Sequence, residues 1–572
     1  MRERATLWTT PLFDEQTRRE VESLLSNPDP TPLVEAFYKD LEFGTGGLRG
    51  IMGAGTNRMN RYTVAMATQG LCNYLLKTFP NQPLSVAVGH DCRNNSPEFA
   101  RTTAEVFSAN GVKVYLFESL RPTPEVSFAV RKLGCQSGVM ITASHNPKVY
   151  NGYKAYWADG AQMIAPHDRN TIAEVAKIRT LQEVKLTPKP ELIQTIGEEI
   201  DAALVQKVQE LVLAPEAIRQ HGAMPVVYTP IHGTGVAIIP RALRACGFTN
   251  IINVPEQDVV SGDFPTVVSP NPEDPAAMAL ALKRAQETGA ELVLGSDPDG
   301  DRIGVGIRTR RGQIKLLSGN QICALLIYYS LERHREQGHL HATDFVVKTI
   351  VTTELVAAMA ASYGVQLYDC YTGFKWIADV IRKNEGKKRY LGGGEESYGF
   401  LREDFIRDKS AVSACCMFCE LTAWAKSKGL NVEDLLEQIY RQYGYFLEEG
   451  VSVVRQGREG AQEIARMMAE YRAHPIASLD GEPVSEVIDY SVLKGTLTQT
   501  GEEFTPDMPT TSNVLQYKTQ SGTILSVRPS GTEPKIKYYI GVRLPFAAGQ
   551  EAQETEAKLR DKIARIRAEL NI

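Results

Sequence analysis

Four short segments of this 572-residue chain carry side chains whose types and spacing could do chemistry. In the first, residues 142–154 (TASHNPKVYNGYK), Ser144 directly follows an apolar run that predicts a strand, and Asn146-Pro147 predicts a turn. A hydroxyl held at the carboxyl end of a strand lies where open α/β sheets bind their ligands. Ser144 is therefore a candidate nucleophile, and an Asn-Pro turn with a hydrogen-bonded His145 is the alternative interpretation.

The second segment, residues 295–302 (GSDPDGDR), places Asp297, Asp299 and Asp301 at alternate positions after an apolar strand. Extended alternation would aim all three carboxylates the same way, and such a set of oxygens suits a hard cation, with Mg²⁺ the better choice than Ca²⁺. Three carboxylates so close together would repel one another strongly unless a cation or Arg302 neutralised them. A solvated acidic turn is the alternative.

The third segment, residues 392–399 (GGGEESYG), combines three glycines with acidic side chains. Glycines let the backbone approach a ligand closely, and Glu395, Glu396 and Ser397 can accept hydrogen bonds from hydroxyl groups. A sugar ring fits such a loop. A glycine-rich turn with exposed acids is the alternative.

The fourth segment, residues 528–535 (RPSGTEPK), can bind a phosphate. Arg528 can hold two phosphate oxygens through its guanidinium, while Ser530, Gly531 and Thr532 add hydroxyl and backbone donors. A hairpin turn is the alternative. Taken together, a nucleophile, metal-binding carboxylates, a hydroxyl-binding loop and a phosphate cradle indicate one site for a small phosphorylated polyol.

The elements around these segments predict three similar α/β blocks followed by a different fourth block. Short apolar strands alternate with amphipathic helices three times, which is typical of mainly parallel sheets. The predicted strands and helices of these blocks are 84–91, 112–118, 137–142, 224–235, 274–288, 291–297, 344–353, 354–363, 365–373 and 389–397. The fourth block has helices over 459–473 and 553–570 around strands 524–530 and 536–544, which indicates an α+β domain.

We therefore predict an α/β protein of four domains, each holding one of the four segments. The predicted domains are residues 1–220 with the Ser144 loop, 221–337 with the aspartate loop, 338–455 with the sugar loop and 456–572 with the phosphate loop. The length alone also predicts about four domains.

The composition is that of a folded protein, with 43% hydrophobic and 23% charged residues. A net charge of −5 gives no overall basic field, so we expect neither nucleic acid nor a membrane as partner. The longest apolar stretch, 414–425, is too short to span a bilayer, and the first twenty residues lack the apolar core of a secretory signal. Nine cysteines without framework spacing indicate reduced thiols and a cytoplasmic protein.

From GTGGLRG (44–50) to RPSGTEPK, the sequence resembles the α-D-phosphohexomutase family over nearly its whole length. Within that family, FGTGGLRG, NGYKAYWADGAQM and DFPTVVSPNPED resemble the phosphoglucomutase-2 and phosphopentomutase branch. The resemblance implies four domains around one central cleft. It also implies an isomerase that moves a phosphoryl group within a phosphosugar, with oligomeric state left undefined.

The resemblance assigns a role to each candidate residue. Ser144 would carry the phosphoryl group and, with Asp297, Asp299 and Asp301, would hold Mg²⁺. Lys154 would be the general acid/base, with a pKa depressed by Mg²⁺ and Arg302. The remaining implied site residues are Arg49, His145, Arg302, Thr372, Gly373 and Lys375 lining the site, Glu395 and Ser397 binding sugar hydroxyls, and Arg528, Ser530, Gly531 and Thr532 docking the phosphate that is not transferred.

The implied reaction interconverts glucose 1-phosphate and glucose 6-phosphate through glucose 1,6-bisphosphate, which also acts as activator. Mannose or pentose phosphates are alternative substrates, because the motifs can recognise phosphate and two hydroxyl groups but not the group at C2 of the sugar. A sugar-bisphosphate synthase, a phosphatase and a non-catalytic sensor are further alternatives. A phosphatase would need water at phosphoserine 144, which a closing cleft excludes, and a sensor would be expected to lack Ser144 or an aspartate.

Four features need separate interpretation. Gly46 stands where the family usually has serine in the first loop, and Lys409-Ser410-Ala411 replaces the common Lys-Asp-Gly, although serine can still cap the following helix. Cys416 and Cys419 lie on a predicted apolar helix and indicate core packing more than metal or redox use. His232 either touches the cleft or supports a turn.

Overall fold

The computed structural model describes all residues except 45, 456 and 531–534. It divides into two compact units that interleave along the sequence. Unit 1 comprises Met1–Leu317, Ile381–Lys383 and Tyr398–Lys428, and unit 2 comprises Ser318–Val380, Asn384–Ser397 and Gly429–Ile572. The predicted limits of the four domains stay a prediction.

The first sheet of unit 1 has the strand order β1-β5-β4-β2-β3-β6. β2, β3, β4 and β6 are parallel to one another, while β5 is antiparallel to both β4 and β1. The mainly parallel sheet expected from the strand–helix alternation is confirmed, with one reversed strand, β5, between the edge strand β1 and β4. The strands are β1 (Gly47–Ile51), β2 (Ser85–His90), β3 (Lys113–Phe117), β4 (Ser137–Ile141), β5 (Tyr150–Trp157) and β6 (Ile193–Ile196).

Helices pack against this sheet, and further helices precede it at the N-terminal end of the chain. Those next to the sheet bury an apolar core that contains Val86, Val139, Ile141 and Tyr153. Their bounds and those of the remaining helices of this part are α1 (Arg2–Leu7), α2 (Glu15–Ser26), α3 (Thr31–Phe37), α4 (Arg61–Thr78), α5 (Ser96–Ala109), α6 (Thr123–Lys132), α7 (His167–Val175), η1 (Leu181–Glu183), η2 (Pro190–Leu192), α8 (Glu198–Gln209) and α9 (Pro215–His221).

The second sheet of unit 1 has the order β11-β10-β9-β7-β8. β7 is parallel to β8 and β9, whereas β10 returns antiparallel to β9. The aspartate segment is the connection between β9 and β10, so it lies at the carboxyl end of β9. The elements of this sheet and the remaining elements of unit 1 are β7 (Val226–Thr229), α10 (Gly235–Ala245), β8 (Ile251–Asn253), α11 (Pro255–Asp258), α12 (Pro275–Thr288), β9 (Leu292–Ser296), β10 (Ile303–Arg308), β11 (Ile314–Leu316), β15 (Phe400–Leu401) and α16 (Ala411–Ser427).

Unit 2 contains a parallel sheet and an antiparallel sheet. β12 is parallel to β13 on one side and to β14 on the other, as the third predicted block requires. The elements of this part are α13 (Gly319–Glu336), β12 (Asp344–Thr349), α14 (Leu355–Tyr363), β13 (Gln366–Cys370), α15 (Phe374–Asn384), β14 (Arg389–Gly394) and α17 (Val432–Tyr443).

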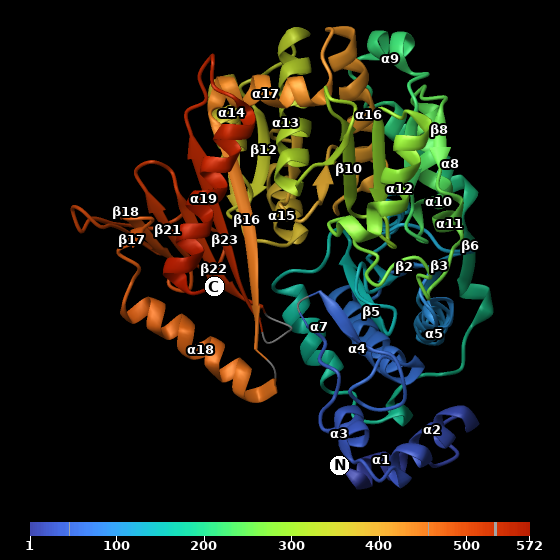
Figure 1. Cartoon of the computed structure of the whole chain (residues 1–572). Coiled ribbons are helices and arrows are strands. Elements are labelled where there is room, and N and C mark those ends of the chain that lie inside the picture. The colour runs from blue at the N-terminus through green and yellow to red at the C-terminus, as the bar shows by residue number, and fades with distance from the viewer. Residues whose placement is uncertain (45, 456, 531–534) are drawn as a thin grey trace. The chain divides into compact units, whose positions relative to one another are not determined.

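The antiparallel sheet has the order β16-β23-β22-β21-β18-β19-β20, and β17 pairs with β18. Helix α19 packs along β16 and β23, as Figure 1 shows, which confirms the α+β character of the C-terminal block. The elements are β16 (Tyr445–Val454), α18 (Gly457–Ala473), β17 (Ser478–Leu479), β18 (Glu482–Asp489), β19 (Lys494–Leu497), β20 (Glu503–Phe504), β21 (Leu515–Thr519), β22 (Ile524–Pro529), β23 (Lys535–Leu544) and α19 (Ala552–Leu570).

Two sheets of unit 2 share an apolar cluster. Ile350 and Tyr371 follow β12 and β13, and they pack with Ile488, Tyr490 and Val514 from the antiparallel sheet.

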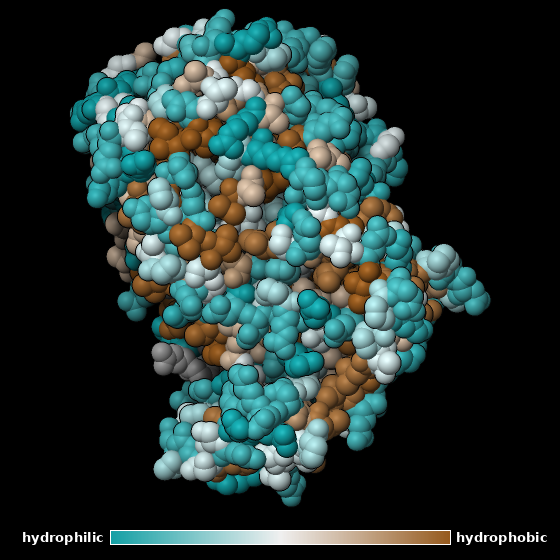
Figure 2. All heavy atoms as spheres, turned by 90° about the vertical axis from the view of Figure 1, so that its right-hand side faces the viewer, coloured by the Kyte–Doolittle hydropathy of each residue, from teal (hydrophilic) through white to brown (hydrophobic). Residues whose placement is uncertain are grey.

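The surface is mixed in character: on the face drawn in Figure 2, hydrophobic side chains form separate small patches among hydrophilic ones. Within the described part of the chain, every helix is too short or too polar to cross a membrane.

Candidate functional site

Ser144 is held in a tight loop just beyond the end of β4. Its φ of 51° lies in the left-handed region, which side chains other than glycine adopt only where surrounding contacts enforce it. The Ser144 amide donates to Thr142 Oγ1 at 2.8 Å. Its hydroxyl donates to Asp297 Oδ2 at 2.9 Å and lies 3.2 Å from His145 Nδ1. Ser144 is 4% exposed, so the loop presents a buried hydroxyl to a carboxylate.

The aspartate segment forms a turn, and the expectation of extended alternation is wrong. Asp297 Oδ1 accepts the amides of Asp301 and Arg302, each at 3.0 Å, and Gly300 donates to the Asp297 carbonyl at 3.0 Å. Gly300 has a φ of 64°, which allows the chain to reverse into β10. The turn still brings one oxygen from each of Asp297, Asp299 and Asp301 within 4.8 Å of one another.

These three carboxylates fit a divalent cation. All are 0–1% exposed, and Asp299 Oδ1 and Asp301 Oδ1 have no hydrogen-bond partner among the described residues. Burial and the neighbouring Asp299 and Asp301 raise the pKa of Asp297 well above its ordinary value, which a bound cation would reverse. Three carboxylate oxygens beside a serine hydroxyl are the hard ligands that Mg²⁺ prefers.

Two lysines neutralise much of this negative charge. Lys154 Nζ lies 2.7 Å from Asp299 Oδ2 and 3.1 Å from Asp301 Oδ2, and Lys409 Nζ lies 2.9 Å from Asp301 Oδ2. The expected depression of the Lys154 pKa depends on a bound Mg²⁺ and stays a prediction, and the carboxylates by themselves shift this pKa the other way. Burial alone would lower that pKa, but Asp299 and Asp301 outweigh it and raise the pKa.

Cationic side chains approach the Ser144 loop from other strands. Arg49, on β1, donates through Nη1 to Asn146 Oδ1 at 3.1 Å. Arg302 forms an ion pair with Glu273. Burial, followed by the charges of Arg302 and Arg49, lowers the pKa of His145 well below its ordinary value. His145 is therefore a neutral imidazole beside the Ser144 hydroxyl at neutral pH.

Three residues near the site were missed by the motif analysis. Thr123, at the start of α6, donates its hydroxyl to Asp299 Oδ2 and its amide to the Asp299 carbonyl, both at 2.8 Å. Lys409 follows Asp408, which accepts hydrogen bonds from Tyr156 and Gln162 of the first sheet region. Arg93 follows β2 and is the third.

The motif analysis had one signal for Lys409, the family's Lys-Asp-Gly position, but none for Thr123 or Arg93. The neighbouring Ser410 caps α16 as predicted, because its side chain accepts the amide of Ser413.

The sugar loop belongs to unit 2. Glu395 Oε1 accepts the amide of Gly373 at 2.7 Å, and Gly373 has a φ of 114° where the chain turns into α15. Glu396 accepts hydrogen bonds from Thr349 at 3.3 Å and Thr352 at 3.5 Å. Burial, with the nearby Glu395, raises the pKa of Glu396 to about 7.

The predicted phosphate loop is described only at its ends. Arg528 lies on β22 opposite Lys537 of β23, and the Ser530 amide donates to the Lys535 carbonyl at 2.8 Å. Gly531 and Thr532 lie outside the described residues. Among the other predicted residues of unit 2, Lys375 Nζ lies 5.5 Å from the ring centroid of Trp376, and Thr372 and Ser397 are partly exposed.

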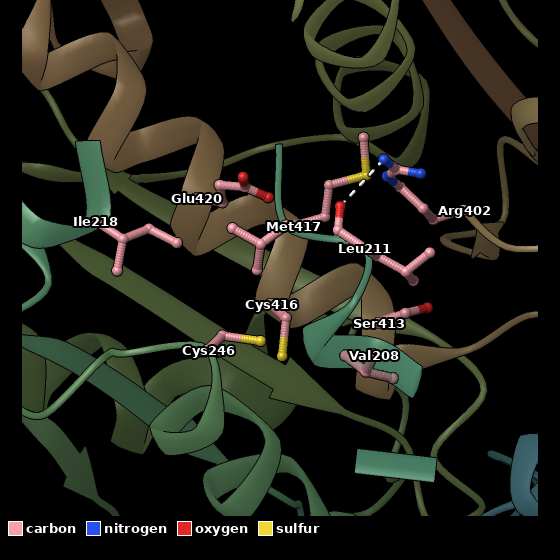
Figure 3. A pocket seen from close by; sticks show the side chains of 10 residues that line it. Val208, Leu211, Ile218, Cys246, Arg402, Ser413, Cys416, Met417 and Glu420 are labelled. Atoms are coloured by element: carbon pink, nitrogen blue, oxygen red, sulfur yellow. Dashed lines mark hydrogen bonds between the residues drawn. The ribbon is translucent and has the colours of Figure 1, made fainter. Parts of the chain in front are cut away.

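Two minor features have structural roles. Cys416 and Cys419 are buried in α16, as predicted, and Figure 3 shows Cys416 pointing toward Cys246 of the α10 end in a small pocket. A hydrogen bond with Cys246 and burial raise the pKa of Cys416, so the thiol is a poor nucleophile. His232 lies 2.7 Å from the Val259 carbonyl and 2.8 Å from Thr266 Oγ1, which supports the turn interpretation.

The family of the chain is decided by comparison with family models. Three of them match in succession: the phosphoglucomutase/phosphomannomutase alpha/beta/alpha domain I over residues 40–182, domain II over 202–311 and domain III over 318–443. The chain belongs to the phosphoglucomutase/phosphomannomutase family. The predicted resemblance to phosphohexomutases is thereby confirmed.

Full-length relatives support this family assignment. The chain is 37% identical over 515 residues to a phosphoglucomutase of Staphylococcus haemolyticus, covering 89% of this chain and 92% of the relative. It is 33% identical over 543 residues to a Schizosaccharomyces pombe protein named "Probable phosphoribomutase", covering 93% and 92%.

Solved structures of the phosphoglucomutase/phosphomannomutase family share the fold. The Paramecium phosphoglucomutase known as parafusin, in its open form, has a TM-score of 0.68 at 17% identity, covering 93% of this chain and 96% of that one. A family protein of Burkholderia thailandensis has a TM-score of 0.65 at 16% identity, covering 92% and 96%. The predicted architecture of three α/β domains and a C-terminal domain is confirmed.

Proposed function

We propose that the protein is a phosphosugar mutase that interconverts glucose 1-phosphate and glucose 6-phosphate through a phosphoserine at position 144. The observation that carries the proposal is the 2.9 Å contact between the Ser144 hydroxyl and Asp297 inside a buried set of three carboxylates. A buried hydroxyl beside oxygen ligands for a cation is the arrangement that phosphoryl transfer requires. The relatives named phosphoglucomutase support glucose as the sugar.

In the proposed first step, phosphoserine 144 gives its phosphoryl group to the free hydroxyl of a sugar monophosphate. The bond from phosphorus to Ser144 Oγ breaks, a bond from phosphorus to the sugar oxygen forms, and the sugar hydroxyl proton leaves to a base. Mg²⁺ bound by Asp297, Asp299 and Asp301 would withdraw charge from the phosphoryl group during transfer. The product of this step is a sugar bisphosphate.

In the second step, the other phosphate of the bisphosphate returns to Ser144 and the isomerised monophosphate leaves. We propose Lys154 as the group that exchanges the proton, because its Nζ lies against Asp299 and Asp301 and is shielded from solvent. His145, Arg302 and Arg49 surround the Ser144 loop with donors for phosphoryl oxygens. Glucose 1,6-bisphosphate would activate the enzyme by phosphorylating Ser144 where this residue carries no phosphoryl group.

For unit 2 we propose binding roles. Glu395 and Ser397 bind sugar hydroxyls, and Thr372, Gly373 and Lys375 form the neighbouring turn. Arg528, Ser530, Gly531 and Thr532 bind the phosphate that is not transferred. The guanidinium and backbone donors of such a loop suit a phosphate from either end of the sugar.

A coupled assay tests the proposal. Purified protein is given glucose 1-phosphate, Mg²⁺ and catalytic glucose 1,6-bisphosphate, and glucose 6-phosphate is followed, with mannose 1-phosphate and ribose 1-phosphate run in parallel. We expect turnover of glucose 1-phosphate. Activity on ribose 1-phosphate alone would keep the chemistry but move the substrate to pentoses, which the Schizosaccharomyces pombe relative makes the second candidate. Silence on all three sugars would contradict the proposal.

We also propose a cytoplasmic location. All nine cysteines are free in the structure, and eight of them are buried. Reduced, buried thiols are typical of proteins in reducing compartments.

A further inference from the structure

One buried arginine side chain binds the main chain of the Ser144 loop. Arg93 lies in the connection from β2 to α5, and β2 is the parallel neighbour of β4, after which the Ser144 loop begins. The carboxyl ends of adjacent parallel strands meet at the same edge of a sheet, which brings Arg93 under the loop although 51 residues separate it from Ser144. The Arg93 side chain is 0% exposed.

The guanidinium of Arg93 uses both of its terminal nitrogens on carbonyls of this loop. Nη2 donates to the Ser144 carbonyl at 2.7 Å and to the Asn146 carbonyl. Nη1 donates to the Pro147 carbonyl at 2.9 Å and to the Tyr150 carbonyl at 3.0 Å. Four carbonyls spread over the loop therefore converge on a single planar cation.

The remaining side of the guanidinium is held as well. Arg93 Nε lies 3.3 Å from Asp91 Oδ2, and the other oxygen of this carboxylate, Oδ1, accepts the Arg93 amide at 2.9 Å and the Ser96 hydroxyl at 2.7 Å. The guanidinium carbon lies 5.1 Å from the ring centroid of Phe264, a buried residue. The four terminal N–H groups of the guanidinium thus donate to four carbonyls, which a lysine ammonium with three donors cannot reproduce, while Nε faces the Asp91 carboxylate as an ion pair without a hydrogen bond.

We propose that Arg93 is a positioning residue for phosphoryl transfer at Ser144. Its hydrogen bonds go to main-chain carbonyls and not to the Ser144 hydroxyl. It fixes the carbonyl of Ser144, a residue held at a φ of 51°, and three carbonyls of the loop that follows, and so keeps the Ser144 hydroxyl directed at Asp297. The inference rests on the proposed function, because it assigns the residue that aligns the proposed phosphocarrier.

The first test compares Arg93→Lys with Arg308→Lys. Arg308 is a matched control, because its guanidinium also donates to three carbonyls, those of Ala285, Ala290 and Gly312, at 2.6–2.9 Å. It lies at the end of β10 remote from the aspartate turn. Both substitutions keep the positive charge and replace the planar guanidinium with an ammonium group, so both remove a comparable set of buried hydrogen bonds.

The readouts are kcat, KM for glucose 1-phosphate, the melting temperature and the phosphate content of Ser144, to which kcat is normalised. We expect Arg93→Lys to lower kcat about 100-fold with KM within about threefold, because misplacing a reacting group by about 1 Å has an effect of that size. Arg308→Lys is expected to keep kcat within about threefold at a similar loss of melting temperature. Equal kcat in the two variants would overturn the proposal.

A second variant keeps the test valid where Arg93→Lys yields no folded protein. Asp91→Asn retains an acceptor for the Arg93 amide and removes the charge that faces Nε, and we expect a drop in kcat of about tenfold, the lower range for partners that orient a reacting group. A wild-type kcat in this variant would overturn the positioning role. The wild-type protein is run first: its failure to turn over sugar phosphates contradicts the proposed function, and not the Arg93 inference alone.

Discussion

Ser144 Oγ lies 2.9 Å from Asp297 Oδ2, although 153 residues separate the two along the chain. The serine follows β4 of the first sheet, and the aspartate follows β9 of the second. Each sheet delivers one half of the chemistry at the carboxyl end of a strand, where loops are free to carry function. The contact joins a phosphocarrier candidate to a cation site.

In the proposed function, the three aspartates set the metal dependence. Asp299→Asn keeps the shape of the side chain but removes the charge that Lys154 contacts at 2.7 Å. We expect a weaker response to Mg²⁺ and a fall in kcat of about two orders of magnitude or more, the scale reported for removing one electrostatic group from a transition state. A Mg²⁺ titration of activity checks this. A titration that coincides with that of the wild type would refute the metal assignment.

Removal of the metal should silence the enzyme without unfolding it. Lys154 and Lys409 form ion pairs with two of the three carboxylates. Chelation with EDTA is therefore expected to abolish turnover while the melting temperature changes by only a few degrees, since the two lysines leave only one of the three carboxylate charges unbalanced. Calorimetry with and without EDTA measures it, and cooperative unfolding on chelation would be the opposite result.

Gly233 supports the aspartate turn from outside the site. A Cβ added at this position would lie 2.5 Å from Pro298 Cα, and Pro298 stands between Asp297 and Asp299. Gly233→Ala should displace the turn, raise the Mg²⁺ concentration at half activity and lower kcat by about tenfold or more. Gly450→Ala is the control for added bulk, because nothing lies within 4 Å of its Cβ and its φ is outside the left-handed region. Equal Mg²⁺ response in the two variants would show that the turn tolerates the contact.

Glu403 should make stability depend on pH. Burial raises its pKa to about 7, and the side chain is only 3% exposed. Between its ordinary pKa and pH 7, the folded protein binds more protons at Glu403 than the unfolded chain does, so stability falls as pH rises through this window. The wild type is expected to lose about 2–3 kcal/mol from this group by pH 8 relative to pH 4.5.

Glu403→Gln removes this titration. Its melting temperature should exceed that of the wild type at pH 8 and should match it, within a degree or two, at pH 5. Thermal unfolding of both proteins at the two pH values provides the comparison. A difference of the same size at both pH values would mean that Glu403 is ionised in the folded protein throughout.

The strands and the loops that follow them were predictable because their signals are local. The apolar run Leu292–Leu294 identifies the strand before the aspartates, and the residues after it are the ones a cation needs. The turn itself was not predictable, because it depends on Asp297 Oδ1 accepting the amides of Asp301 and Arg302. Alternation in the sequence indicates an extended chain, and a side chain that bonds to the backbone overrides it.

The partners of the site were harder to predict than its centre. Lys409, just before α16, and Thr123, at the start of α6, reach the aspartates, and no local pattern relates Thr123 to the turn. The direction of the Lys154 pKa shift is hard to predict for a related reason: it depends on whether a cation or the lysine balances the carboxylates. The role proposed for Arg93 can be recognised only from the structure, which shows the loop carbonyls that its guanidinium binds.

The most direct test follows a labelled phosphoryl group. The protein is phosphorylated with ³²P-labelled glucose 1,6-bisphosphate and freed of excess label. One sample is digested to map the labelled residue. A second, undigested sample is mixed with glucose 1-phosphate and Mg²⁺ for a single turnover. We predict one labelled site, Ser144, whose label passes to the sugar within the turnover, and no label or activity in Ser144→Ala. Label that maps to another residue, or a Ser144→Ala variant that turns over at the wild-type rate, would contradict the account.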